Sequence, residues 1–257
     1  MRMYFCGNRL SNSMQQSDWF ESWFGSPYYT ILYQNRDVLE AQEFVENLLR
    51  YLQPLPGSRM VDIACGEGRF AVQLAEHGYH VTGIDLSHLS IEKAKAHETA
   101  DLQFFVHDMR FPFYINYFDY AFNFFTSFGY FAHDRDHLLA AKSFAKGLKK
   151  DGILVIDYLN SDQVLANLVP EETVQRGSYH FHIRRRVERN HIIKDINFTD
   201  ADNKPRHYTE SVAAFSLSDF VRMFKTAGLS LVATFGDYEL NPYQPLDSKR
   251  MIMIFKK

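Results

Sequence analysis

The sequence contains little cysteine and no long apolar run. Of its 257 residues only Cys6 and Cys65 are cysteines, and neither belongs to a Cys-x-x-Cys pair. The pattern therefore predicts neither a zinc site nor the disulfide framework of a secreted protein. No apolar stretch is long enough to span a bilayer, and residues 1–17 lack the apolar core of a signal peptide. We therefore expect a cytoplasmic protein with no metal site and no membrane contact.

The sequence also lacks a large excess of charge of either sign. Its formal net charge is −3 at pH 7, and 23% of its residues are charged. Because nucleic-acid binding usually requires a basic surface, we do not expect DNA or RNA as a partner. Apolar residues make up 46% of the chain and aromatic residues 16%, which indicates a globular protein with a core rich in aromatic side chains.

Helical and strand patterns alternate between residues 36 and 160. Apolar periodicity predicts helices over 36–52, 69–78, 90–98 and 134–152, and strands over 59–64, 80–87, 102–109, 118–125 and 153–160. We expect Asp134 to cap the last of these helices and Gly152 to follow its end. This alternation is typical of a doubly wound α/β fold, in which helices cover both faces of a mostly parallel sheet.

The pattern changes after residue 160. Residues 171–215 show the strict alternation of antiparallel strands, so we predict a small β insertion there, after the fifth strand. A helix over 216–228, with Ser216 or Ser218 near its N-cap, precedes two closing strands at 229–238 and 248–257. The predicted main sheet thus has seven strands, of which the last is antiparallel.

The stretch MVDIACGEGRFA, residues 60–71, places two glycines where a strand meets a helix. Glycines there let the backbone approach a ligand closely, and the N–H groups that begin the helix suit a polar or anionic group. Asp85 ends the next strand, where a carboxylate can accept hydrogen bonds from ribose hydroxyls. The pattern predicts an adenosine-containing cofactor at the carboxyl edge of the sheet.

The glycine turn alone leaves two cofactors open, because residues 66–71 also fit the dinucleotide pattern G-x-G-x-x-A. Three features argue against a dinucleotide. Asp62 lies inside the first strand, and Asp108 gives the third strand a polar end that can meet an adenine ring. The chain also closes with a strand pair rather than a further strand–helix–strand unit.

Residues 61–95 and 118–131 resemble the class I S-adenosylmethionine-dependent methyltransferases, whose motifs occur here in the same order. The resemblance is strong over residues 36–160 and implies a Rossmann-like methyltransferase fold that binds S-adenosyl-L-methionine. The glycine turn would border the methionine part of the cofactor, Asp85 would hold the ribose, and Asp108 would receive the adenine amino group. The implied cofactor-binding residues are Asp62, Ala64, Gly66, Gly68, Asp85, Leu86, Asp108, Met109, Asn123 and Phe124.

The resemblance also suggests roles for the flanking segments. Their own composition predicts that residues 1–18 are a polar leader. By the resemblance, residues 19–56 would form a helical lid from which Tyr33 and Arg36 reach the cofactor, or else a helix that only packs on the sheet. The cofactor-binding domain comprises 57–160 and 216–257. The insertion, 161–215, would cover the acceptor site or form a homodimer contact.

Methyl transfer from a sulfonium is an in-line displacement, so a base is needed only where the acceptor must lose a proton. The candidate catalytic residues follow the fourth strand and are Tyr130 and His133, although a histidine at a helix start can also be structural. We predict a methyltransferase that acts on a small-molecule acceptor. The alternatives are an NAD(P)-dependent oxidoreductase and a non-catalytic cofactor-binding scaffold, and the acceptor itself remains open.

Overall fold

The computed structural model describes residues 19–33 and 38–257, and its centre is a seven-stranded sheet with strand order β10-β11-β5-β4-β1-β2-β3. Strands β1 to β5 are parallel, whereas β11 runs antiparallel to both β5 and β10. The strands are β1 (Arg59–Ile63), β2 (His80–Asp85), β3 (Leu102–Val106), β4 (Phe118–Asn123), β5 (Leu148–Leu159), β10 (Ser230–Phe235) and β11 (Arg250–Lys256). The predicted fold class is confirmed.

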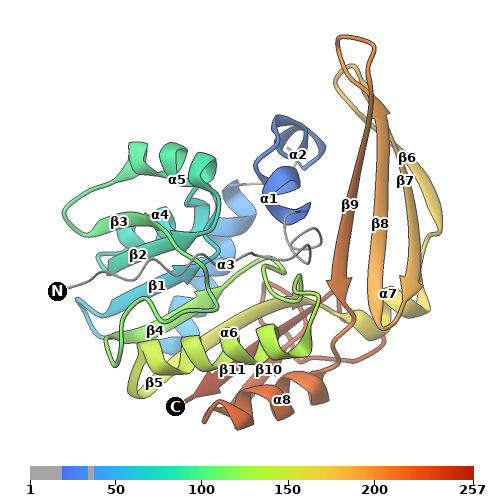
Figure 1. The fold of residues 1–257 in the computed structure, drawn as a ribbon. Helices are drawn as coiled ribbons and strands as arrows, with labels where there is room; N and C mark the ends of the chain where they lie inside the picture. Colours follow the sequence, from blue (N-terminus) through green and yellow to red (C-terminus); the bar gives the residue numbers. More distant parts are fainter. Residues whose placement is uncertain (1–18, 34–37) are drawn as a thin grey trace, which may run out of the picture.

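Helices cover both faces of this sheet (Figure 1). One face packs against α3 (Val38–Leu52), α4 (Arg69–Glu76) and α5 (His88–Ala94), and the other against α6 (Asp134–Gly147) and α8 (Leu217–Thr226). Successive residues of β1 point to opposite faces of the sheet. Met60 belongs to the core beneath α3, α4 and α5, and Val61 belongs to the core beneath α6 and α8. This is the strand alternation expected when both faces of a sheet are buried.

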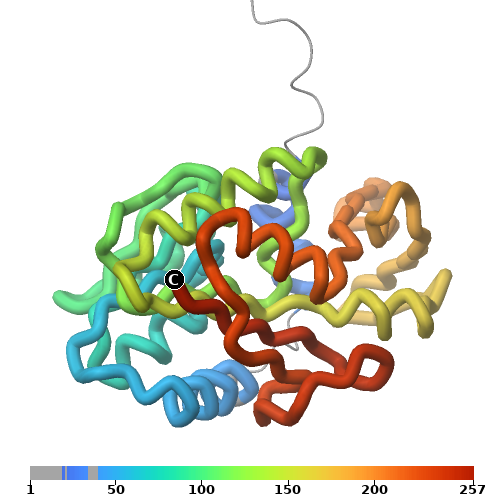
Figure 2. The backbone as a smooth tube through the Cα atoms, turned by 90° about the horizontal axis from the view of Figure 1, so that it is seen from below, coloured from blue at the N-terminus to red at the C-terminus, as the bar shows by residue number. Residues whose placement is uncertain are grey.

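The predicted insertion is a separate four-stranded antiparallel sheet of order β6-β7-β8-β9. It follows α7 (Ser161–Ala166), and its strands are β6 (Glu171–Arg176), β7 (Tyr179–Glu188), β8 (His191–Thr199) and β9 (Pro205–Ala213). Two short helices, α1 (Trp19–Phe24) and α2 (Pro27–Leu32), lie between this sheet and the main sheet (Figures 1 and 2).

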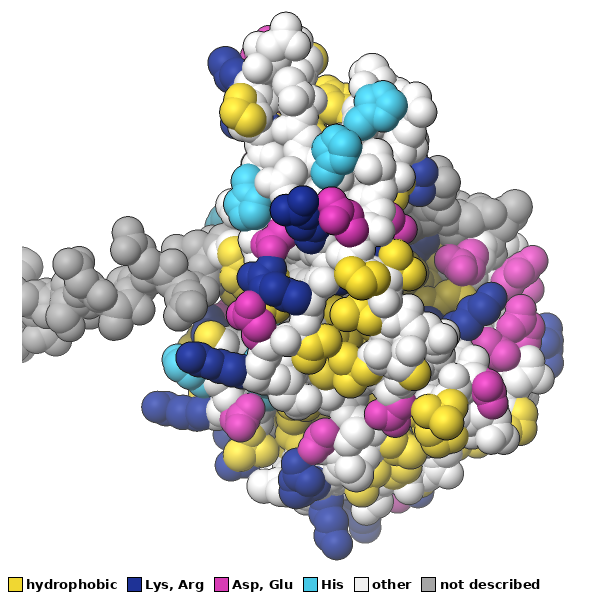
Figure 3. Space-filling model, turned by 90° about the vertical axis from the view of Figure 1, so that its right-hand side faces the viewer, with side chains coloured by type: hydrophobic (Ala, Val, Ile, Leu, Met, Phe, Trp, Pro, Cys, Tyr) yellow, Lys and Arg dark blue, Asp and Glu magenta, His cyan; other side chains and the backbone are white. Residues whose placement is uncertain are grey.

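The two faces of the inserted sheet differ in chemistry. Its inner face packs Phe181, Ile183 and Phe198 against Trp23 and Leu32 of the two short helices. On its outer side, histidine, basic and acidic side chains are intermingled (Figure 3). The inserted sheet therefore supports α1 and α2 through a core of its own. Among the described residues, no helix has both the length and the apolar content that a membrane span requires.

Two expectations about α6 and its neighbours were wrong in detail. The N-cap of α6 is His133 rather than Asp134, and it makes no side-chain capping bond. The helix ends at Gly147, and β5 begins at Leu148 rather than at residue 153, because Leu148 already pairs with Phe118 before the ladder shifts register. The cap expected near the start of α8 is confirmed at Ser216, which forms a capping box with Asp219.

Candidate active site

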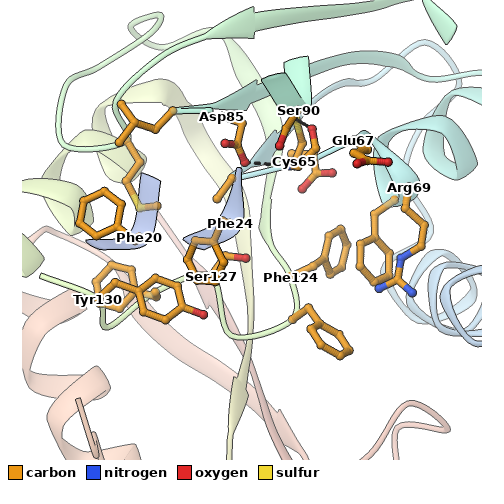
Figure 4. A pocket seen from close by; sticks show the side chains of 18 of the residues that line it. Phe20, Phe24, Cys65, Glu67, Arg69, Asp85, Ser90, Phe124, Ser127 and Tyr130 are labelled. Atoms are coloured by element: carbon orange, nitrogen blue, oxygen red, sulfur yellow. Dashed lines mark hydrogen bonds between the residues drawn. The ribbon is translucent and has the colours of Figure 1, made fainter. Parts of the chain in front are cut away.

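A cavity of about 380 Å³ lies at the carboxyl ends of β1, β2 and β4, beneath α1 and α2. One part of its wall comes from the turn after β1, the end of β2 and the first turn of α5, with Cys65, Glu67, Asp85 and Ser90 (Figure 4). The opposite part is aromatic. Its lining includes Phe20, Phe24, Tyr29, Tyr33, Phe70, Phe124, Phe125, Phe128, Tyr130 and Phe131.

The turn after β1 requires glycine for two different reasons. Gly66 and Gly68 both have positive φ, +57° and +87°, which disfavours other residues. A Cβ atom at Gly68 would lie 2.6 Å from Cζ of Phe104, so the close packing of the turn onto β3 also excludes a side chain. A Cβ at Gly66 would meet no atom within 4 Å, because this glycine borders the open cavity. The backbone is thus exposed to a ligand where the motif predicts it.

Asp85 ties this turn to the next helix. Its Oδ2 accepts a hydrogen bond of 2.8 Å from the N–H of Gly66, and its Oδ1 accepts one of 2.8 Å from the N–H of Ser87. Burial raises the pKa of Asp85, and these two backbone donors oppose that rise. The carboxylate is therefore held in one orientation at the cavity wall, with lone pairs left for ligand hydroxyls.

Asp62 is almost completely buried, with 1% of its surface exposed, and its Oδ2 has no hydrogen-bond partner among the described residues. Burial, reinforced by the negative charge of Asp85, raises its pKa to about 8, although the N–H of Ala71 and the charge of Arg69 oppose the shift. A buried oxygen without a donor is costly. Because Asp62 lines the cavity, a cationic or N–H group of a ligand would satisfy it.

Asp108 lines the cavity beside Leu86 and Met109. Its carboxylate forms a two-pronged pair with Arg110, whose Nε and Nη2 lie 2.9 and 2.5 Å from Oδ2. Burial raises the pKa of Asp108, but the hydrogen bonds and charge of Arg110 outweigh it, so the net shift is downward. Arg110 in turn lies over the ring of Phe131, 5.3 Å from its centre. The sequence reasoning missed this arginine, which keeps Asp108 ionised and oriented.

The two residues expected at the cavity floor behave differently. Phe124 lines the cavity and stacks on Phe70, with ring centres 4.2 Å apart. Asn123 does not reach the cavity. It is fully buried, and its Nδ2 donates a 2.9 Å hydrogen bond to the carbonyl of Ile63, which ties β4 to β1.

The two candidate catalytic residues are also separated. Tyr130 lines the cavity, where its hydroxyl donates to the carbonyl of Thr126 and its ring packs 5.2 Å from that of Phe24. His133 is exposed at the start of α6 and is not part of the cavity lining. The structure therefore brings Tyr130, but not His133, to the site.

The inserted sheet holds the two short helices over the cavity through a partly buried polar cluster. Glu210 of β9 accepts hydrogen bonds of 2.6 Å from Nε1 of Trp23 and 2.8 Å from the hydroxyl of Tyr33. Lys194 of β8 lies 3.4 Å from Glu210, and its burial lowers its pKa against the opposing effect of that carboxylate. Tyr33 lines the cavity, whereas Arg36 lies outside the described residues.

Several lining residues were not singled out from the sequence. Those from α1 and α2 include Phe20, Phe24 and Thr30. The aromatic density of residues 19–33 was the signal for Phe20 and Phe24. Arg69 begins α4 and places its guanidinium 4.6 Å from the ring centre of Phe70, at the edge of the cavity. Nothing in the local pattern distinguishes Arg69 from an ordinary first-turn residue.

Comparison with known proteins adds the decisive observation. The family model described as a methyltransferase domain matches residues 34–234, which include both the glycine turn and the inserted sheet. The chain belongs to this family. S-adenosylmethionine is thus the methyl donor of this methyltransferase, and the nicotinamide alternative is set aside.

Individual relatives of the methyltransferase agree with this result. The putative methyltransferase YqeM of Bacillus subtilis is 28% identical over 193 residues, which are 70% of this chain and 76% of YqeM. The fold matches an S-adenosylmethionine-dependent methyltransferase from Clostridium acetobutylicum, with a TM-score of 0.76 and 16% identity over 89% of this chain and 95% of the other. It also matches the sugar N-methyltransferase KedS8 of a Streptoalloteichus species, with a TM-score of 0.69 and 20% identity over 100% and 99% of the two chains.

Proposed function

We propose that this methyltransferase binds S-adenosylmethionine across the glycine turn and methylates a small molecule held beneath α1 and α2. One observation carries the proposal. The cavity continues without interruption from the polar wall at Asp85 to the aromatic wall at Phe24 and Tyr130. A polar end suits the nucleoside and amino-acid parts of the donor, and an aromatic end suits a compact organic acceptor.

The polar wall supplies a partner for each part of the cofactor. Asp85 would accept the ribose hydroxyls, and Leu86 and Met109 would contact the adenine, whose amino group would donate to Asp108. The unsatisfied Oδ2 of Asp62 would take the ammonium of the methionine part. When bound, the cofactor supplies an electrophilic methyl group, so the task of the protein is to orient the acceptor and to exclude water.

The aromatic wall would position the acceptor and handle its proton where one must leave. Tyr130 and Tyr33 each place a phenol group in the lining. The hydroxyl of Tyr33 is connected to Glu210, which gives a proton a route away from the cavity. We assign the catalytic role to Tyr130 rather than to His133, because His133 lies outside the lining. The homodimer through the inserted sheet stays a prediction.

A transfer experiment tests the proposed function. The protein would be incubated with methyl-tritiated S-adenosylmethionine and a bacterial cell extract divided into small-molecule, nucleic-acid and protein fractions. We expect label in the small-molecule fraction alone, abolished in Asp85→Ala and retained in Asp202→Ala, which removes an exposed carboxylate of the β8–β9 turn. Label only in nucleic acid or protein, or equal transfer by the two variants, would contradict the proposal.

A further inference from the structure

The turn that follows β4 adopts an unfavourable backbone conformation. Phe125 and Thr126 both have positive φ, +56° and +61°, although neither is glycine. The N–H of Ser127 donates a 3.2 Å hydrogen bond to the carbonyl of Phe124 and closes the turn. The left-handed region of backbone dihedral angles is strained for a residue with a Cβ, and most of all for the β-branched Thr126. Such strain persists only where the surroundings enforce it.

The enforcing contacts come from β5. The carboxylate Oδ2 of Asp157 accepts a 2.9 Å hydrogen bond from the N–H of Phe125, and the Asp157 carbonyl accepts one of 2.8 Å from the N–H of Thr126. Both N–H groups of the strained pair are therefore bound by one residue. Asp157 itself is fully buried.

Arg250 of a second strand, β11, pairs with Asp157, and we call these two residues the clamp. Arg250, at the start of β11, donates from Nε to Oδ1 of Asp157 over 2.7 Å and from Nη2 to Oγ1 of Thr126 over 3.0 Å. The hydroxyl of Tyr238 donates to the other carboxylate oxygen of Asp157 over 3.1 Å. The forked guanidinium of Arg250 thus binds both Asp157, which holds the turn, and Thr126, which is part of the turn.

The clamp lies behind the cavity rather than in it. Phe124, Phe125 and Ser127 line the cavity, whereas Asp157, Arg250 and Thr126 are not part of its lining. The hydroxyl of Tyr130, the proposed catalytic residue, donates to the carbonyl of Thr126. The orientation of four lining residues therefore depends on a strained turn that an ion pair holds from the back. Buried ion pairs contribute little net stability, because desolvation offsets their attraction, so stability alone does not account for this one.

We propose that Asp157 and Arg250 are positioning residues, which hold the strained Phe125–Thr126 turn so that the wall and Tyr130 face the methyl acceptor. This inference rests on the proposed function, in which that wall binds the acceptor. The clamp does not touch the polar wall where the donor would bind. Its loss should therefore lower the rate of methyl transfer while donor affinity stays the same.

The test compares two variants of the clamp with a matched control. Thr126→Val keeps the shape of the side chain but removes the acceptor for Arg250, and Arg250→Lys keeps the charge but removes the fork. The control, Lys149→Met, breaks the ion pair of 2.7 Å between Lys149 and Asp119, which joins β4 and β5 at the ends of these strands opposite the clamp. These three variants, together with Thr126→Asn as a rescue variant, are measured for melting temperature, for S-adenosylhomocysteine affinity by calorimetry, and for initial rate of tritium transfer to the small-molecule fraction.

We expect Thr126→Val and Arg250→Lys to lower the transfer rate at least tenfold with an S-adenosylhomocysteine Kd within twofold of the unaltered protein. Lys149→Met should lower the melting temperature and keep the rate. Thr126→Asn, which retains an acceptor and tolerates the left-handed region, should restore the rate. A purely structural role predicts the opposite pattern, in which rates follow melting temperatures across all four variants, and that result would overturn the inference.

Amide hydrogen exchange provides a readout that needs no acceptor. In Thr126→Val the N–H groups of Phe125 and Thr126 should exchange at least tenfold faster, while those of β1 are unchanged. Unchanged hydrogen exchange at these two N–H groups would overturn the proposed role of Asp157 and Arg250, even if methyl transfer were lost. Absence of transfer by the unaltered protein, with exchange altered as expected, would instead refute the proposed function and leave the clamp standing.

Discussion

Asp62 should make the affinity for the cofactor depend on pH. Its carboxyl group is buried, its Oδ2 has no partner among the described residues, and its pKa is raised to about 8. At neutral pH the carboxyl group of the free protein is therefore mostly protonated. If the ammonium of the cofactor binds at this oxygen, it favours the ionised form, so binding must release a proton.

The size of the effect follows from the raised pKa. Below the pKa, each unit of pH lowers the ionised fraction about tenfold, so the Kd for S-adenosylhomocysteine should rise by about that factor between roughly pH 7.5 and pH 6.5. Calorimetry in two buffers of different ionisation enthalpy would count the released protons, which should approach one per bound ligand. The Asp62→Asn variant should bind more weakly, with a Kd that no longer changes over this range.

A variant of another lining residue serves as the control. His107 also lines the cavity, and His107→Gln should keep the full dependence on pH. If Asp62→Asn retained the same slope, the released proton would belong to another group. If the unaltered protein released none, the ammonium would not lie at Asp62, and that part of the proposed site would be refuted.

Three further predictions concern the same wall. Asp85→Ala should weaken S-adenosylhomocysteine binding at least about tenfold in calorimetry, because hydrogen bonds to a charged group are lost; an unchanged Kd would remove the ribose assignment. Gly68→Ala should lower the free energy of unfolding by about 2 kcal/mol more than Gly78→Ala in urea titrations, because both glycines have positive φ but only the Cβ at Gly68 would meet Phe104; equal losses would show that packing onto β3 is unimportant. The contribution of Asp62 to the free energy of unfolding should fall as the pH rises from about 4 to about 8, because folded Asp62 retains its proton while the unfolded chain, with a pKa near 3.8, has lost it. The difference in unfolding free energy between the unaltered protein and Asp62→Asn should therefore change over this range, and a constant difference would exclude such a contribution from Asp62.

The parts of the fold that local patterns encode were predictable from the sequence. Apolar periodicity and the glycine turn depend only on residues that are close in sequence. The main sheet, the insertion and the cavity wall around Asp62 and Asp85 could therefore be predicted from the amino-acid sequence alone. The end of α6 was misplaced because the pairing of Leu148 with Phe118, a contact between distant segments, decides where β5 begins.

The rest of the site depends on contacts that no local pattern contains. His133 and Tyr130 are near neighbours in sequence, yet the turn into α6 exposes one and directs the other into the cavity. Asn123 is a polar residue at the end of β4, as a site residue would be, but its side-chain amide donates to the carbonyl of Ile63 and does not reach the cavity. Arg250 is 93 residues from Asp157 in the sequence, so their pairing becomes visible only when β11 and β5 lie side by side.

The most direct test of the account is a crystal structure of the protein with S-adenosylhomocysteine. We expect the ribose hydroxyls on Asp85, the ammonium within hydrogen-bond distance of Asp62, and the sulfur facing the aromatic wall that contains Phe124 and Tyr130. A ligand bound elsewhere, or one whose sulfur points away from that wall, would contradict the proposed site and the route of methyl transfer that depends on it.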